Sequence, residues 1–200
     1  MVRHGWLAAA LVLAIGPAWA ATPAQPDAAA AAEVIKDWPK PSQDAAQAML
    51  RKYGAPQEAT ATMLLWSGNG PWVRTIVHKT AVEHDFPQKH ADVLEQAVQY
   101  RVPLNFFAAL ATFDGSLVPD RTRGELTVHC DTEATNILVL NLARDIIRGE
   151  KTADQARTAL AAAMREIQAG RTPADATELR LGPAQGDLSD PDTAVVTAPK

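Results

Sequence analysis

Apolar residues recur at helical spacing in the second half of the chain. Residues 132–148 carry leucine, isoleucine and valine around most of a helix's circumference, a pattern typical of a buried central helix. Gly149 ends this helix, and Thr152 with Gln155 forms a capping box that begins another, which runs to about Ala169. The pattern therefore predicts a C-terminal pair of helices.

Two further segments favour β-hairpins. Residues 60–66 and 72–79 are rich in β-branched and aromatic side chains, and the turn sequence SGNGP separates them. Residues 116–119 and 125–130 flank a second turn, DRTRG. A loop is expected at 84–89, and helices are expected at 42–53, 90–100 and 104–112. We therefore predict an α+β fold in which two β-hairpins form a small antiparallel sheet packed against several helices.

Composition sets the expected domain boundaries. Residues 1–20 combine a short cationic start, an apolar run and the small-residue sequence AWA, which is the pattern of a secretory signal peptide. An Ala/Pro-rich leader follows at 21–41, in which Asp27 is expected to cap a short helix. A single α+β domain is expected at 42–169. Residues 170–200, rich in Pro, Asp, Thr and Gly, are expected to form a disordered tail.

These features predict an exported protein, periplasmic or secreted after cleavage near Ala20/Ala21, with no integral membrane segment in the mature chain. The chain has a net charge of -4 at pH 7 and so lacks the basic surface that binding to nucleic acids or anionic membranes requires. P-loop, dinucleotide and GxSxG motifs are missing from the sequence, so no cofactor is predicted.

The strand expected at 125–130 separates two sets of side chains, because alternate residues of a strand share a face. Leu126, Val128 and Cys130 form one set, and Glu125, Thr127 and His129 form the other. Cys130 therefore points away from His129, which argues against a Cys–His nucleophile pair. A small buried hydrophobe is the expected role of this cysteine, with a reactive or intermolecularly bonded thiol as the alternative.

Glu125 and His129, with Asp131 close by in sequence, are the candidate catalytic residues. A carboxylate beside a histidine can fix its tautomer and tune its pKa, as general-base catalysis requires. The same polar stripe is typical of the solvent-facing side of an antiparallel sheet. Both interpretations stay open.

His84 and His90 are the candidate metal ligands, and carboxylates accompany them at Asp85 and Asp92. Imidazole and carboxylate groups suit zinc. The spacing of the two histidines matches no established metal motif, however, and HExxH is missing from the sequence. Surface histidines are therefore the expected reading, and no metal site is predicted.

The two hairpin turns supply a candidate binding surface. Aromatic and arginine side chains near such turns are typical of interaction sites. The residues in question are Trp66, Asn69, Trp72, Arg74, Arg121 and Arg123. The alternative is that both tryptophans fold back onto the sheet as part of the core.

Residues 52–66, KYGAPQEATATMLLW, follow a predicted helix and lead into a hairpin. In this respect the chain resembles small outer-membrane assembly lipoproteins of the helix–hairpin type. It has no lipid-carrying cysteine at Ala21, and no functional residue is carried over from the resemblance.

The leading functional hypothesis is a non-enzymatic binding or protein-interaction module that recognises an envelope protein or a small ligand. A small periplasmic hydrolase using Glu125 and His129 is the alternative. The third hypothesis is a structural envelope protein tethered by its leader.

Overall fold

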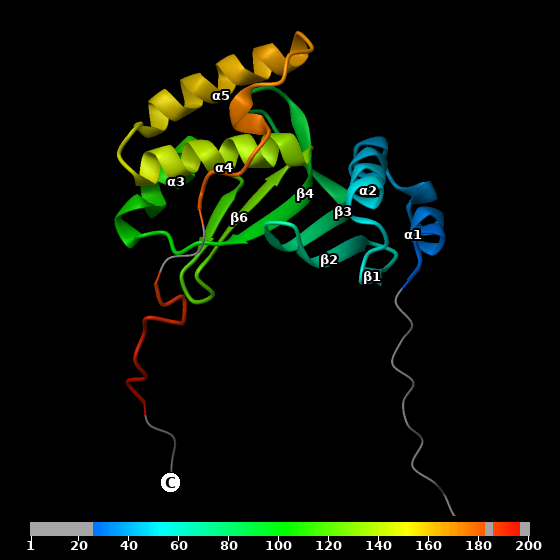
Figure 1. Ribbon diagram of the computed structural model, residues 1–200, viewed down its shortest axis with the longest axis horizontal. Coiled ribbons are helices and arrows are strands. Elements are labelled where there is room, and N and C mark those ends of the chain that lie inside the picture. Colours follow the sequence, from blue (N-terminus) through cyan, green and yellow to red (C-terminus); the bar gives the residue numbers. More distant parts are fainter. Residues whose placement is uncertain (1–25, 183–185, 197–200) are drawn as a thin grey trace, which may run out of the picture.

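The computed structural model describes residues 26–182 and 186–196. Within these residues the chain forms five α-helices and one antiparallel sheet of six strands, so the α+β class is confirmed (Figure 1). The expected signal peptide at 1–20 lies outside the described residues. No helix in the described part of the chain is long and apolar enough to cross a membrane.

The sheet is larger than the two hairpins that the sequence predicts. Its strand order is β1-β2-β3-β4-β6-β5, with every neighbouring pair antiparallel. The expected hairpins correspond to β2–β3 and β5–β6. The strands are β1 (Glu58–Ala59), β2 (Met63–Asn69), β3 (Trp72–His84), β4 (His90–Gln99), β5 (Leu117–Asp120) and β6 (Glu125–Cys130).

The helix expected at 90–100 is wrong, because this segment forms strand β4 in the middle of the sheet. Val93, Leu94, Ala97 and Val98 are spaced as on a helix face, yet all four are buried in the strand. A central strand that is buried on both faces loses the alternation of apolar and polar residues that identifies a strand from sequence. Strand β4 therefore joins the two hairpins into one sheet.

The helices begin largely where capping chemistry predicts. Asp27 caps α1 by accepting a hydrogen bond from the backbone N–H of Ala30, and the capping box of Thr152 and Gln155 at the start of α5 is confirmed. The helix expected at 42–53 begins slightly earlier, at Lys40, so Ser42 lies inside it and its hydroxyl donates to the carbonyl of Lys79 at 3.0 Å. The helices are α1 (Ala28–Val34), α2 (Lys40–Tyr53), α3 (Phe107–Phe113), α4 (Glu133–Ile147) and α5 (Ala153–Gln168), with short 3-10 turns at Ile35–Asp37, Leu104–Phe106 and Ala174–Ala176.

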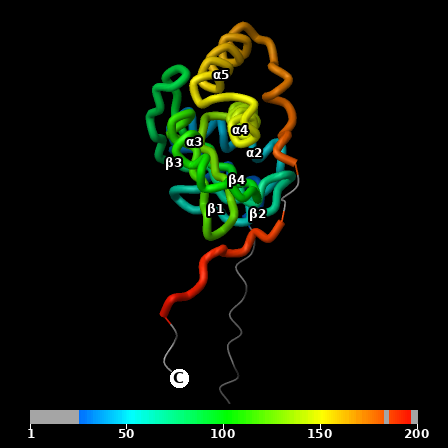
Figure 2. The backbone as a smooth tube through the Cα atoms, turned by 90° about the vertical axis from the view of Figure 1, so that its left-hand side faces the viewer, coloured from blue at the N-terminus to red at the C-terminus, as the bar shows by residue number. Residues whose placement is uncertain are grey.

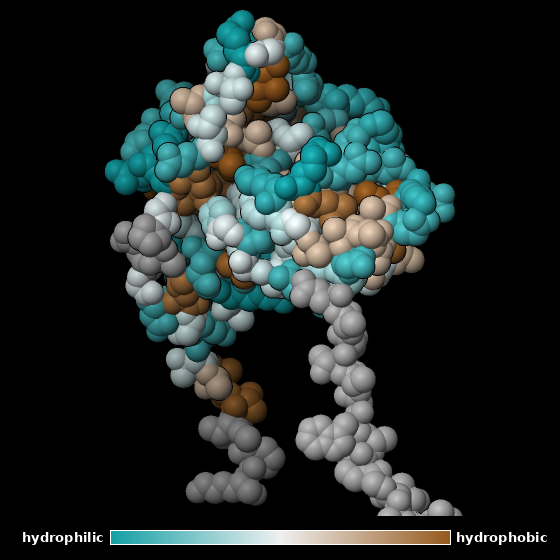
Figure 3. Space-filling view, turned by 45° about the vertical axis from the view of Figure 1, so that its right-hand side comes forward, coloured by the Kyte–Doolittle hydropathy of each residue, from teal (hydrophilic) through white to brown (hydrophobic). Residues whose placement is uncertain are grey.

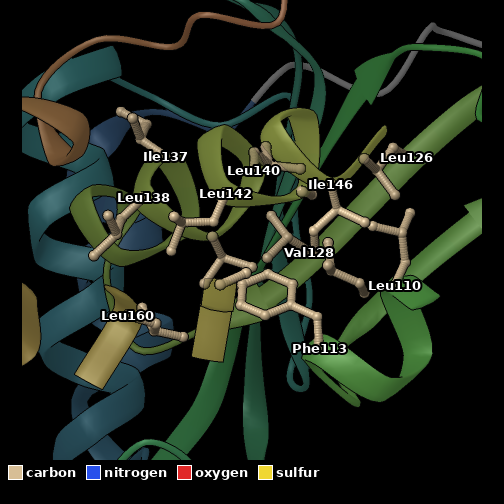
Figure 4. Packing of buried hydrophobic residues seen from close by; sticks show 14 of the residues in the cluster. Leu110, Phe113, Leu126, Val128, Ile137, Leu138, Leu140, Leu142, Ile146 and Leu160 are labelled. Carbon is tan, nitrogen blue, oxygen red and sulfur yellow. The ribbon is translucent and has the colours of Figure 1, made fainter. Parts of the chain in front are cut away.

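Two apolar clusters hold the helices on the sheet. Helix α4 packs over β6, with α3 beside it and α5 above it, so the larger cluster has sheet and helices in successive layers (Figure 2). Its buried side chains interlock between the helices and the sheet (Figure 4). Helix α2 packs on β3 and β4, and α1 lies against β1, with the smaller cluster between these helices and the sheet. Figure 3 shows that apolar patches on the α1–α2 side of the molecule are broken up by hydrophilic residues.

The folded region extends past the boundary expected at Ala169. The side-chain amide nitrogen of Asn141 donates to the carbonyls of Asp175 and Glu178, both at 2.8 Å. Its amide oxygen accepts from the backbone N–H of Arg180 at 2.7 Å. Ala176 is buried against α4, so this part of the expected tail belongs to the core.

Candidate metal centre

His84, His90 and Asp92 meet at one end of the β3–β4 hairpin. His84 is the last residue of β3 and His90 the first residue of β4, and the two are direct register partners. Asp92 stands two residues further along β4. Directly opposed residues and residues two apart on a strand share a face of the sheet, so the three side chains point the same way.

The three side chains form a compact donor set. One ligand atom of each lies within 4.8 Å of the other two, the only such group among the residues the structure describes. His90 Nε2 is 3.1 Å from Asp92 Oδ1, and His84 Nδ1 is 3.4 Å from Asp92 Oδ2. Ligand bonds of about 2.0–2.1 Å to a tetrahedral zinc ion place neighbouring donor atoms roughly 3.3 Å apart. The two observed separations are close to this value and end on different oxygens of the Asp92 carboxylate.

The orientation of His90 is fixed from its other ring nitrogen. His90 Nδ1 lies 2.9 Å from the carbonyl oxygen of Gln88. A carbonyl only accepts hydrogen bonds, so Nδ1 carries the proton and Nε2 is directed at Asp92. Histidines that bind metals commonly donate their second ring N–H to a backbone carbonyl in this way.

The environment of His90 favours a positive charge at this position. Burial disfavours the charged imidazolium, but Asp92 and the Gln88 carbonyl outweigh burial and raise the pKa of His90 to about 9. A metal cation bound at His90 Nε2 would take the place of the proton that this nitrogen carries in the imidazolium.

Asp92 is held on one side and left open on the other. Its side chain is 7% exposed, and Oδ2 accepts a hydrogen bond from the hydroxyl of Ser116. Within the described residues, Oδ1 is buried and makes no hydrogen bond of good geometry, although it contacts His90. Burial opposes ionisation of Asp92, but the neighbouring donors His90 and Ser116 lower its pKa. His90 is thus the charged partner of Oδ1 among the described residues, and a metal ion bound here would take the place of that charge.

Other polar side chains border these ligands. Ser116 Oγ lies 3.2 Å from His84 Nδ1, and the backbone N–H of Ser116 donates to the Asp114 carboxylate at 2.8 Å. Burial raises the pKa of Asp114. Cys130 Sγ lies 3.3 Å from His90 Nε2, and burial raises the pKa of the thiol well above its ordinary value. The sequence does not indicate that Ser116 or Asp114 lies near the histidines. Both residues stand in the loop between α3 and β5, and only the folded sheet brings that loop here.

The stripe of Glu125 and His129 lies on the opposite face of the sheet and forms a charged network. Arg74 Nη1 contacts Glu125 Oε2 at 2.5 Å and Arg74 Nε contacts Glu95 Oε1 at 3.1 Å. His129 Nε2 lies 3.4 Å from Glu95 Oε2, and His78 Nε2 lies 3.2 Å from the same oxygen. Glu95 is thus the centre of the network, and Glu125 has Arg74 rather than His129 as its ionic partner.

Mutual stabilisation sets the charges of this network. Hydrogen bonds from His129, His78 and Arg74 hold the pKa of Glu95 far below its ordinary value. The hydrogen bond between His129 and Glu95 in turn raises the pKa of His129. The remaining catalytic candidate, Asp131, accepts a hydrogen bond from Thr135 Oγ1 at 3.2 Å near the start of α4.

The tryptophans of the first turn are buried. Trp66 Nε1 donates to the carbonyl of Gly54 at 3.0 Å, and Trp72 Nε1 donates to Glu133 Oε1 at 2.5 Å. Asn69 Nδ2 donates to Thr75 Oγ1 at 3.0 Å. These side chains pack against neighbouring parts of the fold instead of forming an aromatic surface.

The second turn lies at the same end of the sheet as the first, because Gln99, at the far end of β4 from His90, pairs with Glu125. Arg121 forms an ion pair with Asp192, and Arg123 lies 3.7 Å from Asp120. Both arginines are therefore remote from His84 and His90, which stand at the opposite end of β3 and β4.

No protein-family model, curated protein or solved structure matches this chain. Its function is therefore argued from the geometry of the site.

Proposed function

We propose that this protein is an exported, non-enzymatic binding module whose ligand is a divalent transition-metal ion, with zinc the best fit. The ligands are His84 Nδ1, His90 Nε2 and a carboxylate oxygen of Asp92. The observation that carries the proposal is the convergence of these three ligand atoms within 4.8 Å of one another.

The chemistry of the donor set selects the class of ion. Zinc and its neighbours in the first transition row accept imidazole nitrogen together with carboxylate oxygen. Calcium and magnesium prefer six or more oxygen ligands, and two of the three donors here are nitrogens. The site therefore favours zinc over the hard cations.

Binding is better supported than catalysis. Glu125 and His129, the residues of the hydrolase hypothesis, are each engaged by other charged groups, Arg74 and Glu95 respectively. Neither is free to act as a general base without breaking an ion pair. The metal ligands themselves are largely buried, with His84 the most exposed at 19%. These features suit a site that holds an ion.

Zinc binding to the purified chain without a histidine tag tests the proposal. One equivalent of zinc should bind and raise the stability of the fold by about 2.7 kcal/mol when free zinc reaches 100 times the dissociation constant. His84→Gln and Asp92→Asn should each remove this stabilisation.

His78→Gln is the matched control, because it also removes one histidine but from the opposite face of the sheet. It should bind zinc as the original chain does. Absence of zinc binding by the original chain, or equal binding by Asp92→Asn, would contradict the proposal.

A further inference from the structure

The C-terminal segment of residues 186–192 lies against the turn that joins β5 and β6. Arg101 holds the two together, because its guanidinium donates to backbone carbonyls of both. Nε donates to the carbonyl of Asp187 at 3.2 Å, Nη2 donates to that of Ser189, and Nη1 donates to that of Arg121 at 3.1 Å. Figure 1 shows the segment in red beside this turn. The segment is therefore docked on the folded domain.

A second contact fixes the far end of the segment. Both terminal nitrogens of Arg121 bond to the Asp192 carboxylate, Nη1 to Oδ2 and Nη2 to Oδ1. This paired geometry matches a planar guanidinium to a carboxylate. The side chains are 36% exposed for Arg121 and 57% exposed for Asp192, so water weakens the ion pair. The contact therefore selects a carboxylate without holding it tightly.

The backbone of the segment also packs closely on the turn. A Cβ atom at Gly124 would lie 2.8 Å from the carbonyl oxygen of Leu188 and 3.2 Å from its Cβ, so the turn has no room for a side chain there. The segment holds its own shape through two aspartates. Asp187 and Asp190 each accept a hydrogen bond from the backbone N–H two residues further on, at 2.8 and 3.1 Å.

An apolar hollow borders the two arginines. It has a volume of about 380 Å³, and Pro191 of the segment forms part of its wall. Leu104 on the same wall is exposed even with the segment in place. The segment therefore leaves part of this apolar surface open. The residues that line the hollow are Arg101, Val102, Pro103, Leu104, Arg121 and Pro191.

Charge complementarity matches the segment to this surface. Residues 186–192, GDLSDPD, contain three aspartates and no basic residue. Among the described residues, Arg101 donates to carbonyl oxygens alone, so its positive charge has no carboxylate in direct contact. Arg101 and Arg121 therefore attract an acidic chain to this end of the sheet.

We propose that the surface of Arg101, Arg121 and the hollow beside them recognises an extended acidic peptide of a partner protein. Residues 187–192 occupy it as an internal competitor. Backbone carbonyls and a carboxylate are groups that any acidic peptide presents, and the ion pair with Asp192 is exposed, so exchange is possible. A segment of the same chain competes at an effective concentration on the order of 1 mM when the link is short. A partner therefore binds by displacing the segment.

This surface is separate from the proposed metal site. Arg101 follows the end of β4 at which Gln99 pairs with Glu125, whereas His84 and His90 pair at the other end of β4. Either proposal can therefore fail without the other.

Fluorescence anisotropy with a labelled synthetic peptide of residues 186–196, GDLSDPDTAVV, tests the inference on the full chain. Asp192→Asn should bind the peptide roughly fivefold more tightly than the original chain, because it releases the internal segment from an exposed ion pair. Adding Arg121→Gln to Asp192→Asn should remove this gain. Adding Arg123→Gln instead is the matched control and should preserve it, because Arg123 contacts Asp120 in the same turn.

The acidic character of the ligand is tested with the peptide GNLSNPNTAVV, in which asparagine replaces each aspartate. It should bind Asp192→Asn at least about tenfold more weakly, and binding of the acidic peptide should weaken as salt increases. Equal binding of the two peptides would overturn the inference. So would equal binding of the acidic peptide by the original chain and Asp192→Asn, or its failure to bind any of these chains. No metal is added, so these outcomes leave the metal site standing.

Discussion

His84 and His90 face each other as register partners across the β3–β4 hairpin, with their ring centroids 4.9 Å apart. The hydrogen-bonded ladder of the two strands fixes both backbones, so little conformational entropy is lost when the rings bind a common ion. Asp92 completes the set from the same strand as His90. The proposed metal site is therefore largely formed before any ion binds.

Zinc affinity should increase with pH up to the pKa of His90. Asp92 and the Gln88 carbonyl, acting against burial, raise that pKa to about 9, so a proton competes with the metal for Nε2 at lower pH. The apparent affinity should rise about tenfold per pH unit between roughly pH 7 and pH 9. Competition titrations against a chelator measure this slope, and an affinity that is flat over the range would contradict the assignment of His90.

Ser116→Ala should weaken zinc binding without removing a ligand. The Ser116 hydroxyl donates to Asp92 Oδ2 and orients the carboxylate. Loss of such an outer partner costs about 10- to 100-fold in metal affinity. Calorimetric titration measures the change, and Ser67→Ala in the exposed part of β2 is the matched control. Unchanged affinity in Ser116→Ala would show that Ser116 does not position Asp92.

Glu133→Gln should destabilise the fold by about 2 kcal/mol, because hydrogen bonds to a charged group contribute about 1.5–3 kcal/mol. Glu133 Oε1 accepts from Trp72 Nε1 at 2.5 Å and from Gln96 Nε2 at 3.2 Å, and Oε2 contacts Lys52 Nζ at 2.5 Å. Urea denaturation measures the loss. The exposed Glu150→Gln variant should lose far less, and equal losses in the two variants would contradict this role.

Glu133 should also contribute to acid sensitivity. Burial opposes its ionisation, but hydrogen bonds from Lys52, Tyr53 and Trp72 prevail and lower its pKa in the folded state below the ordinary 4.5. Its contribution is therefore present above pH 4.5 and is lost as the pH falls through the lowered pKa. Stability measured downwards from pH 6 should fall less steeply in Glu133→Gln, and parallel curves would contradict this origin.

His129→Gln should cost more stability in mild acid than in base. The hydrogen bond to Glu95 raises the pKa of His129 above 6.5, so the stabilisation is fully present below pH 6.5 and is lost as the pH rises through the raised pKa. Urea denaturation at about pH 5.5 and about pH 9 compares the two states of the imidazole. Equal losses at both values would show that the ion pair with Glu95 contributes nothing.

The sequence predicts the helical pair α4–α5 and both expected hairpins because these segments carry local signals. The capping box of Thr152 and Gln155 is one such signal, and the glycine-rich turn between β2 and β3 is another. Gly70 in that turn has a φ of 66°, which glycine adopts without strain. Such chemistry depends on a few adjacent residues, and tertiary packing does not override it here.

Strand β4 carries no comparable local signal, and most of what the sequence fails to predict follows from that one strand. Its apolar residues are buried on both faces, so the helical reading of 90–100 hides the register that unites His84 with His90. The same reading hides Glu95, the centre of the charged network. These are long-range consequences of strand pairing, which the spacing of His84 and His90 along the chain does not reveal.

The most direct measurement is a crystal structure of the purified chain grown with zinc, with anomalous diffraction recorded on both sides of the zinc absorption edge. The proposed function predicts one zinc peak within bonding distance of His84 Nδ1, His90 Nε2 and an Asp92 carboxylate oxygen. An ordered His84–His90–Asp92 cluster without a zinc peak, in crystals that contain excess zinc, would contradict it.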